Sequence, residues 1–158
     1  SNKIIQAGEI VSFDTDMVGP YGYCADISRT YVEGNKFSES QKDLYLMAVE
    51  QINHNSRLIK PGMSFKEFTE KSWILPEEYY GNRYSVMVHG IGLCDEWPAI
   101  RYPTDGGERS GVFETNMTIT VESYIGKVGG NEGVKLEQQY LVGQNSLELM
   151  SHHPLEDI

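Results

Sequence analysis

Residues 13–31 read FDTDMVGPYGYCADISRTY and gather three aspartates, Asp14, Asp16 and Asp26, around a turn rich in glycine. The flanks of this turn are rich in β-forming residues, which predicts a β-hairpin over residues 9–32. Carboxylates that face one another across a hairpin repel, so a positive charge is expected between them. Scattered arginine side chains and solvent would supply it in one interpretation, and a metal ion in the other.

Composition limits what the chain can be. Its 158 residues are 39% hydrophobic, which is enough for one domain with a real core. The 13 Lys and Arg against 23 Asp and Glu give a net charge of -10, which argues against nucleic acid and membrane as partners, because both bind basic surfaces. No apolar run approaches the roughly 18 residues of a membrane span, and no signal segment opens the chain. We therefore expect a cytoplasmic protein.

Two helices are predicted after the hairpin. The first covers residues 37–59, with a serine at its N-cap, and ends before Pro61. The second begins at Ser64, where Glu67 three residues later completes a capping box, and stops before Pro76.

The rest of the chain is predicted to be mostly strand. Strands are expected over residues 83–93, 117–126 and 133–143. The Pro/Gly-rich residues 97–111 are predicted to be loop, and residues 147–158 a short helix followed by an extended end. A hairpin, two helices and several strands indicate an α+β fold.

Each later strand carries one more candidate metal ligand: His89 in VMVHGIG, Glu122 in ITVES and Glu137 in VKLEQ. Taken singly they are weak, because a lone histidine at a strand end is more often a structural residue. A glutamate among β-branched residues is usually the outward position of a strand. Together with the aspartates they form a set of hard oxygen ligands and one imidazole, which suits a pair of divalent ions such as Mn, Fe, Co or Zn.

The order Asp, Asp, His, Glu, Glu, with HGIGL around the histidine, TVE at the first glutamate and G-x-x-x-E at the second, resembles the pita-bread superfamily of methionine aminopeptidase, aminopeptidase P, prolidase and creatinase. The resemblance covers roughly residues 8–145. It implies that two divalent metal ions are bound by Asp16, Asp26, His89, Glu122 and Glu137, and Asp14 adds a sixth carboxylate.

The same resemblance implies a partial pita-bread fold: the last hairpin of the first half and the second α/β half. Residues 1–158 are then expected to be the C-terminal, catalytic, metal-binding part of a longer protein, with the first half and an N-terminal domain upstream. Without the first half, residues 1–158 would expose an apolar face, which we expect another chain to cover, as in a homodimer.

Three positions depart from the members that cleave Xaa-Pro bonds. Those members carry H-G-I-G-L-x-x-H-E, whereas this chain reads HGIGLCDEWP, with Glu96 in place of the second histidine. Their T-V-E-P-G is TVESY here, and their arginine two residues before the last glutamate is Lys135. When the metal ligands are retained but the residues around them are changed, a changed reaction is indicated.

The extra Asp14, HGIGLCDEWP and YSVMVHG resemble dimethylsulfoniopropionate lyases of the DddP type. This resemblance implies β-elimination of a small zwitterionic substrate to dimethyl sulfide and acrylate, with Asp95 as the base, Tyr84 beside the substrate and iron as the metal. Trp97 would add an aromatic face for the sulfonium. An Xaa-Pro dipeptidase or aminopeptidase-like metallohydrolase and a metal-free relative are the alternatives, and Asp95 and Glu96 would otherwise be a solvated acidic pair.

Overall fold

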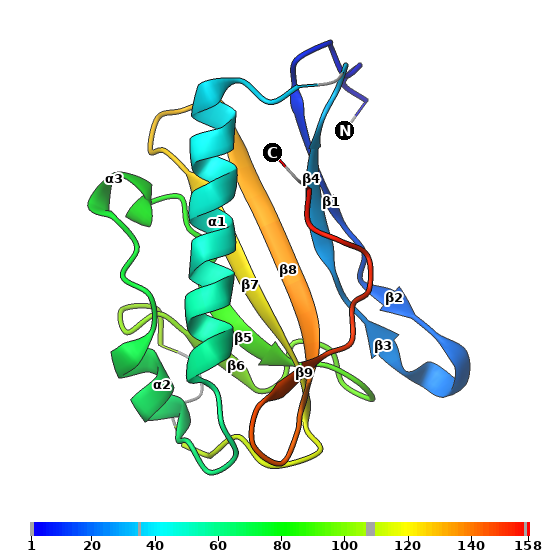
Figure 1. Ribbon diagram of the computed structural model, residues 1–158, viewed down its shortest axis with the longest axis vertical. Coiled ribbons are helices and arrows are strands. Elements are labelled where there is room, and N and C mark those ends of the chain that lie inside the picture. Colours follow the sequence, from blue (N-terminus) through cyan, green and yellow to red (C-terminus); the bar gives the residue numbers. More distant parts are fainter. Residues whose placement is uncertain (1, 35, 107–109, 157) are drawn as a thin grey trace.

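The hairpin comes first in the chain, followed by a long helix and an antiparallel sheet (Figure 1). The computed structural model describes residues 2–34, 36–106, 110–156 and 158. Its elements are β1 (Ile10–Asp14), β2 (Met17–Val18), η1 (Pro20–Gly22), β3 (Cys24–Ala25), β4 (Ser28–Val32), α1 (Glu39–Leu58), α2 (Phe65–Lys71), α3 (Glu77–Tyr80), β5 (Val86–Gly90), β6 (Ala99–Arg101), β7 (Thr118–Gly126), β8 (Gly133–Val142) and β9 (Leu147–Leu149). The predicted α+β class is confirmed.

The hairpin predicted over residues 9–32 is present and has an interruption near its middle. β1 pairs with β4, and β2 pairs with β3 closer to the turn. Between the two ladders the Thr15 hydroxyl donates to the Ile27 carbonyl (3.0 Å) and accepts from the Ile27 amide (3.2 Å). A side chain thus replaces the missing ladder bonds. The interruption lies among the three aspartates and frees that part of the backbone from the regular ladder.

The sheet has the strand order β6-β5-β7-β8-β9, and all of its pairs are antiparallel. Helix α1 packs on β7 and β8, and the hairpin strand β4 packs on β8 (Figure 1). Alternation along the strands sends Val121 and Leu136 into the core with α1. Glu122 and Glu137, one position further on, therefore point to the other face.

Capping explains where the helices begin. Ser38 and Gln41 form a complete capping box at α1, with the Ser38 amide donating to Gln41 Oε1 (2.9 Å). At α2 the Ser64 hydroxyl accepts the Glu67 amide (3.0 Å), but the Glu67 carboxylate binds Lys71 (2.6 Å). The capping box predicted there is therefore only half formed. Among the residues that the structure describes, each helix is too short or too polar to span a bilayer.

Three short elements correct the predicted boundaries. α2 ends at Lys71 well before Pro76, and the separate α3 follows that proline. Residues 97–111 contain strand β6, which pairs with β5; residues 107–109 of this predicted loop lie outside the described residues. The tail begins as strand β9, not as a helix, because β8 offers unpaired backbone groups at the sheet edge. Elements this short contain too few residues to show a hydrophobic period.

Arg29 of β4 is a buried cation that joins the hairpin to β8 and to the tail. Its guanidinium donates to the carbonyl oxygens of Glu137 (2.6 Å) and Pro154 (3.0 Å), to that of His153, and to Gln138 Oε1 (2.6 Å). Burial lowers the pKa of Arg29, but a guanidinium remains charged in proteins. The hairpin with its aspartates is therefore held at a fixed place on the sheet.

We predict that Arg29→Met will lower the free energy of unfolding by about 3 kcal/mol, because several buried acceptors lose a charged donor. Urea denaturation measures this loss. Limited proteolysis should also cut the released tail after Met150 faster. Arg57→Met, which removes an exposed arginine from the last turn of α1, is the matched control and should change little. Equal effects of the two substitutions would contradict the role given to Arg29.

Candidate metal centre

Strand pairing places two glutamates face to face. Glu122 of β7 is the direct partner of Glu137 of β8, and their exposed fractions are 1% and 0%. Like charges directly opposite each other destabilise a sheet, and burial removes the water that would screen them. This pair therefore requires positive charge close by.

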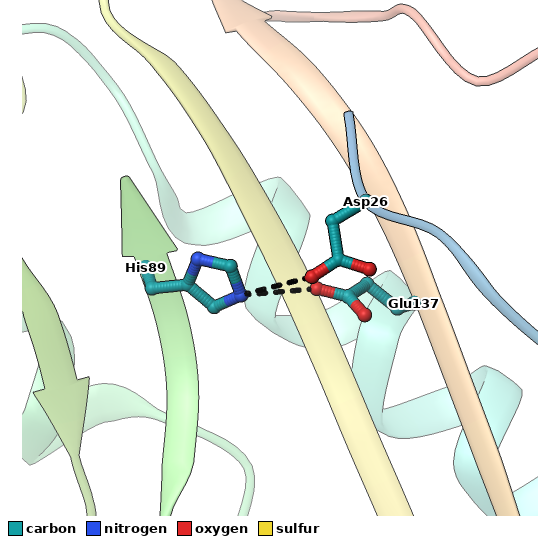
Figure 2. Close-up of side chains that lie close together, drawn as sticks. All are labelled: Asp26, His89 and Glu137. Carbon is teal, nitrogen blue, oxygen red and sulfur yellow. Dashed lines mark hydrogen bonds and ion pairs between the residues drawn. The ribbon is translucent and has the colours of Figure 1, made fainter. Parts of the chain in front are cut away.

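His89, near the end of β5, points at Glu137 of this pair and at Asp26 of the hairpin (Figure 2). Its Nε2 lies 3.1 Å from Glu137 Oε1, 3.7 Å from Glu122 Oε1 and 3.8 Å from Asp26 Oδ2. Its Nδ1 lies 3.0 Å from the carbonyl oxygen of Gly90, which can only accept a hydrogen bond. Nδ1 therefore carries a proton, and Nε2 is the nitrogen turned toward the carboxylates. A ring held in this way presents Nε2 to a metal ion.

The hairpin brings its aspartates to the same place. Asp26 forms a group with His89 and Glu137 in which all candidate ligand atoms lie within 4.8 Å of one another. A second such group joins Asp16 and Asp95 to Asp26. The two groups share Asp26, so they are parts of one site.

Asp14 lies at the edge of this site, where its two oxygens have different partners. Oδ1 accepts the Ser28 hydroxyl (2.5 Å), and Oδ2 lies 3.5 Å from the Lys135 ammonium. The structure therefore gathers Asp26, His89, Glu122 and Glu137 closely, adds Asp16 through Asp26, and leaves Asp14 at the rim.

Two oxygens in the site are unsatisfied. Asp26 Oδ1 and Glu122 Oε1 are buried and have no hydrogen-bond partner among the described residues. Burial, then the charge of Glu137, raises the pKa of Asp26 to about 8. Burial also raises the pKa of Glu122 to about 8, although Lys135 opposes it. Buried, mutually repelling oxygens without donors are what a bound divalent cation satisfies, so the residues fit a metal ion.

The other two members of the site show opposite shifts. Burial acts to raise the pKa of Glu137, but the hydrogen bond from His89 and the charge of Lys135 lower it to about 2. Burial acts to lower the pKa of His89, but its hydrogen bond to Glu137 and the charge of Glu122 raise it to about 9. Without metal, Glu137 and His89 therefore form a charged pair.

Lys135 is a second cation in the site. Its Nζ lies 2.5 Å from Glu122 Oε2 and 3.5 Å from Glu137 Oε2. The Thr30 hydroxyl of β4 fixes its backbone, accepting the Lys135 amide (3.0 Å) and donating to the Lys135 carbonyl (2.7 Å). Burial opposes its charge, but Glu122 and Glu137 outweigh this and raise the pKa of Lys135. The ammonium thus remains charged beside the glutamates.

Glu96 and Lys135, two of the three positions that depart from the pattern of the Xaa-Pro-cleaving members, both contact Tyr84. Its hydroxyl donates to Glu96 Oε1 (3.1 Å), and Lys135 Nζ lies 4.8 Å from the centre of its ring. Partial burial and the charges of Glu122 and Glu96 raise the pKa of Tyr84, so it remains a neutral donor. The third departure, Ser123, points to the other face and donates to Gln51 of α1 (2.6 Å). It serves packing, whereas the other two border the site.

Ser28 was not predicted as part of the site. Its hydroxyl contacts both Asp14 Oδ1 and Glu137 Oε2 (3.0 Å), which links the hairpin to β8. The available signal was the register of the hairpin, which places Ser28 opposite Asp14.

The loop after β5 closes another side of the site. Trp97 is 60% exposed and borders a cavity of about 300 Å³ that also reaches His89. At Gly90 a Cβ would lie 2.1 Å from the Trp97 carbonyl oxygen, so only glycine permits this approach. The loop is therefore held against the strand that carries His89.

Comparisons with known proteins agree with this geometry. Residues 1–144 match the model of metallopeptidase family M24. The chain is 39% identical over 158 residues to dimethylsulfoniopropionate lyase DddP of Roseovarius nubinhibens, covering 98% of this chain and 35% of that protein. It is 31% identical over 156 residues to the Xaa-Pro dipeptidase of Pyrococcus furiosus, covering 96% of this chain and 42% of that protein. The chain thus spans well under half the length of these relatives.

A solved structure shows the same fold. The prolidase from Pyrococcus furiosus superposes with a TM-score of 0.80 at 28% sequence identity, covering 98% of this chain and 44% of that chain.

We predict that the metal-free protein loses stability as pH rises from about 5 to 8. The pKa of Asp26 and Glu122 is raised to about 8, so the fold keeps protons that the unfolded chain has released. His89, raised to about 9, adds to the loss above its ordinary value of 6.5. Each extra proton held by the fold costs about 1.4 kcal/mol per pH unit. Glu137 acts in the opposite direction only below about pH 4.5.

Urea denaturation in the presence of a chelator measures this slope. Glu122→Gln should flatten it, and a bound divalent ion should reverse it, because metal binds the deprotonated carboxylates. Stability that is constant or rises over this range in the chelator would contradict the prediction.

We predict that Lys135→Met will destabilise the protein by about 3 kcal/mol, because a buried ion pair loses one partner. Lys135→Arg keeps the charge and should retain most of the stability. Lys127→Met, which removes an exposed lysine paired with Glu78 (2.7 Å), is the control and should have little effect. Urea denaturation of the three variants tests this, and similar results for both methionine variants would contradict it.

Proposed function

This chain belongs to metallopeptidase family M24 and has the pita-bread fold of its prolidases, and we propose that the protein is a metal-dependent lyase acting on dimethylsulfoniopropionate. The products are dimethyl sulfide and acrylate. The 39% identity to a dimethylsulfoniopropionate lyase over 98% of this chain supports the substrate. Because the chain spans 35% of that relative, the proposal concerns the whole protein.

The observation that carries the proposal is the place of Asp95. A β-elimination needs a base beside the carbon next to the substrate carboxylate. The carboxylate of Asp95 lies within 4.8 Å of those of Asp16 and Asp26, at the edge of the candidate metal centre. It is half-buried, and its Oδ1 accepts the Glu96 amide (3.0 Å), which orients it. This arrangement supports Asp95 as the base.

We propose that two divalent ions occupy the centre, with iron first and manganese, cobalt or zinc as alternatives. The ligands in this proposal are Asp14, Asp16, Asp26, His89, Glu122 and Glu137. Bound there, the ions would act as Lewis acids on the substrate carboxylate and make the neighbouring proton more acidic.

In this reaction, individual residues of the chain have separate roles. Asp95 takes the proton, the electron pair left on carbon forms the double bond of acrylate, and the carbon–sulfur bond breaks with its electrons on sulfur. Asp95 afterwards returns the proton to water. Tyr84, a neutral donor, borders the substrate, and Lys135 holds Glu122 in place.

A homodimer is part of the same proposal. The hairpin exposes several large apolar side chains, which favours a covering partner: Phe13, Met17, Val18, Tyr21 and Tyr23.

An Xaa-Pro metallohydrolase is the second candidate. The 31% identity to the Xaa-Pro dipeptidase and the TM-score of 0.80 with the prolidase favour it. Glu96, at the place of the histidine of Xaa-Pro-cleaving members, weighs against it.

We predict that Asp95→Asn in the whole protein lowers dimethyl sulfide release by about 10²- to 10⁴-fold, which is the usual contribution of a general base. Metal content and the free energy of unfolding should stay unchanged, because a base is not a ligand. Gas chromatography measures the sulfide and elemental analysis the metal. Asp43→Asn, which removes an exposed carboxylate on α1, is the control.

Three outcomes would overturn this assignment. Full release by Asp95→Asn would remove Asp95 from the reaction. Loss of metal together with activity would make Asp95 a ligand. A wild-type protein that cleaves Xaa-Pro peptides and releases no dimethyl sulfide would be a hydrolase.

A further inference from the structure

Glu96 is held in an unusual backbone conformation beside the site. Its φ of 56° lies in the left-handed region, which residues other than glycine rarely adopt. Such strain persists only where the surroundings impose it, and it is common at functional sites. Here the Glu96 amide donates to Asp95 Oδ1 (3.0 Å), and the Tyr84 hydroxyl donates to Glu96 Oε1 (3.1 Å). The first bond ties the Glu96 backbone to Asp95, and the second holds the Glu96 carboxylate at Tyr84.

The carboxylate of Glu96 has no cation in the described part of the chain. Lys135 lies at the face of the Tyr84 ring and is engaged by Glu122, Glu137 and Asp14. The hydroxyl end of the same ring meets Glu96. One tyrosine therefore separates the cation of the metal centre from an exposed carboxylate without a counter-charge.

The neighbours of Glu96 strengthen its negative potential. Asp95 precedes it and lies close to Asp16 and Asp26. Trp97 follows it in the chain and is 60% exposed, so an aromatic side chain is open to solvent in the same loop. A carboxylate and the face of an aromatic ring both attract a cation such as a sulfonium or quaternary ammonium group. A small zwitterion can place its own carboxylate at the metal centre and its cation at this corner.

We propose that Glu96, oriented by the Tyr84 hydroxyl, is a specificity-determining residue that selects substrates with a fixed positive charge at the end opposite their carboxylate. This inference rests on the proposed lyase function and gives its substrate class: sulfonium or quaternary ammonium carboxylates. A neutral substrate of the same shape gains nothing from Glu96. The charge on the substrate, rather than its size, is what this residue recognises.

Two ligands of equal shape test this directly. 3-(Trimethylammonio)propionate and 4,4-dimethylpentanoate differ only in a nitrogen that carries the charge and a carbon that does not. Isothermal titration calorimetry on the intact, metal-loaded protein should show about fivefold tighter binding of the cation, the upper end of what an exposed ion pair contributes. Neither ligand carries the sulfonium leaving group, so binding is measured without turnover.

Variants at Glu96 should remove this preference. Glu96→Gln keeps an acceptor for Tyr84 but removes the charge, so the two ligands should bind nearly equally. Its KM for dimethylsulfoniopropionate should rise about fivefold with a smaller change in kcat. Glu96→Gly relieves the left-handed backbone and serves if the glutamine variant does not fold. Glu50→Gln, which removes an exposed charge from α1, is the control and should keep the preference.

The outcomes separate this inference from the proposed function. Equal binding of the two ligands by the wild type, or a preference retained by both Glu96 variants, would overturn the role of Glu96. A preference that disappears in these variants supports it, even in a protein that releases no dimethyl sulfide. In that last case the lyase assignment fails and the recognition of a cation stands.

Discussion

The pairing of Glu122 with Glu137 across β7 and β8 is the constraint on which the site depends. Two buried carboxylates in direct register are unfavourable unless cations lie between them. The chain supplies Lys135 on one side and His89 on the other, yet one oxygen of Glu122 is left without a donor. The strands thus bury these carboxylates with too little positive charge around them, and a bound divalent ion would supply the missing charge.

The two faces of β7 explain how an apolar core and a charged site share the same strands. Toward α1, Ser123 and Gln51 form a neutral network that continues to Tyr102 (2.5 Å) within an apolar core. On the opposite face, toward the hairpin, the same strand carries the charged side chain of Glu122. The helix side supplies the burial energy, and the hairpin, fixed by Arg29 through backbone carbonyls, supplies the remaining carboxylates.

Much of this was predictable, for identifiable reasons. The hairpin and α1 were predicted because turn residues and capping act locally, and the convergence of Asp26, His89 and Glu137 was expected from the resemblance to the pita-bread enzymes. β6, β9 and α3 were missed or misassigned, because three or four residues carry no period. The roles of Ser28 and Arg29 depend on the register and docking of the hairpin, which local patterns do not contain.

The meeting of Glu96 and Lys135 at Tyr84 shows why departures from a family pattern are best interpreted in three dimensions. In the sequence they are separate substitutions of equal weight, together with Ser123. In space Ser123 belongs to the core, whereas the other two occupy the hydroxyl end and the face of one ring. A lysine at the face and a glutamate at the hydroxyl hold that ring between opposite charges. Changing one of them alone would alter the surroundings of the other, so the pair is better regarded as one change in the chemistry of the site than as two.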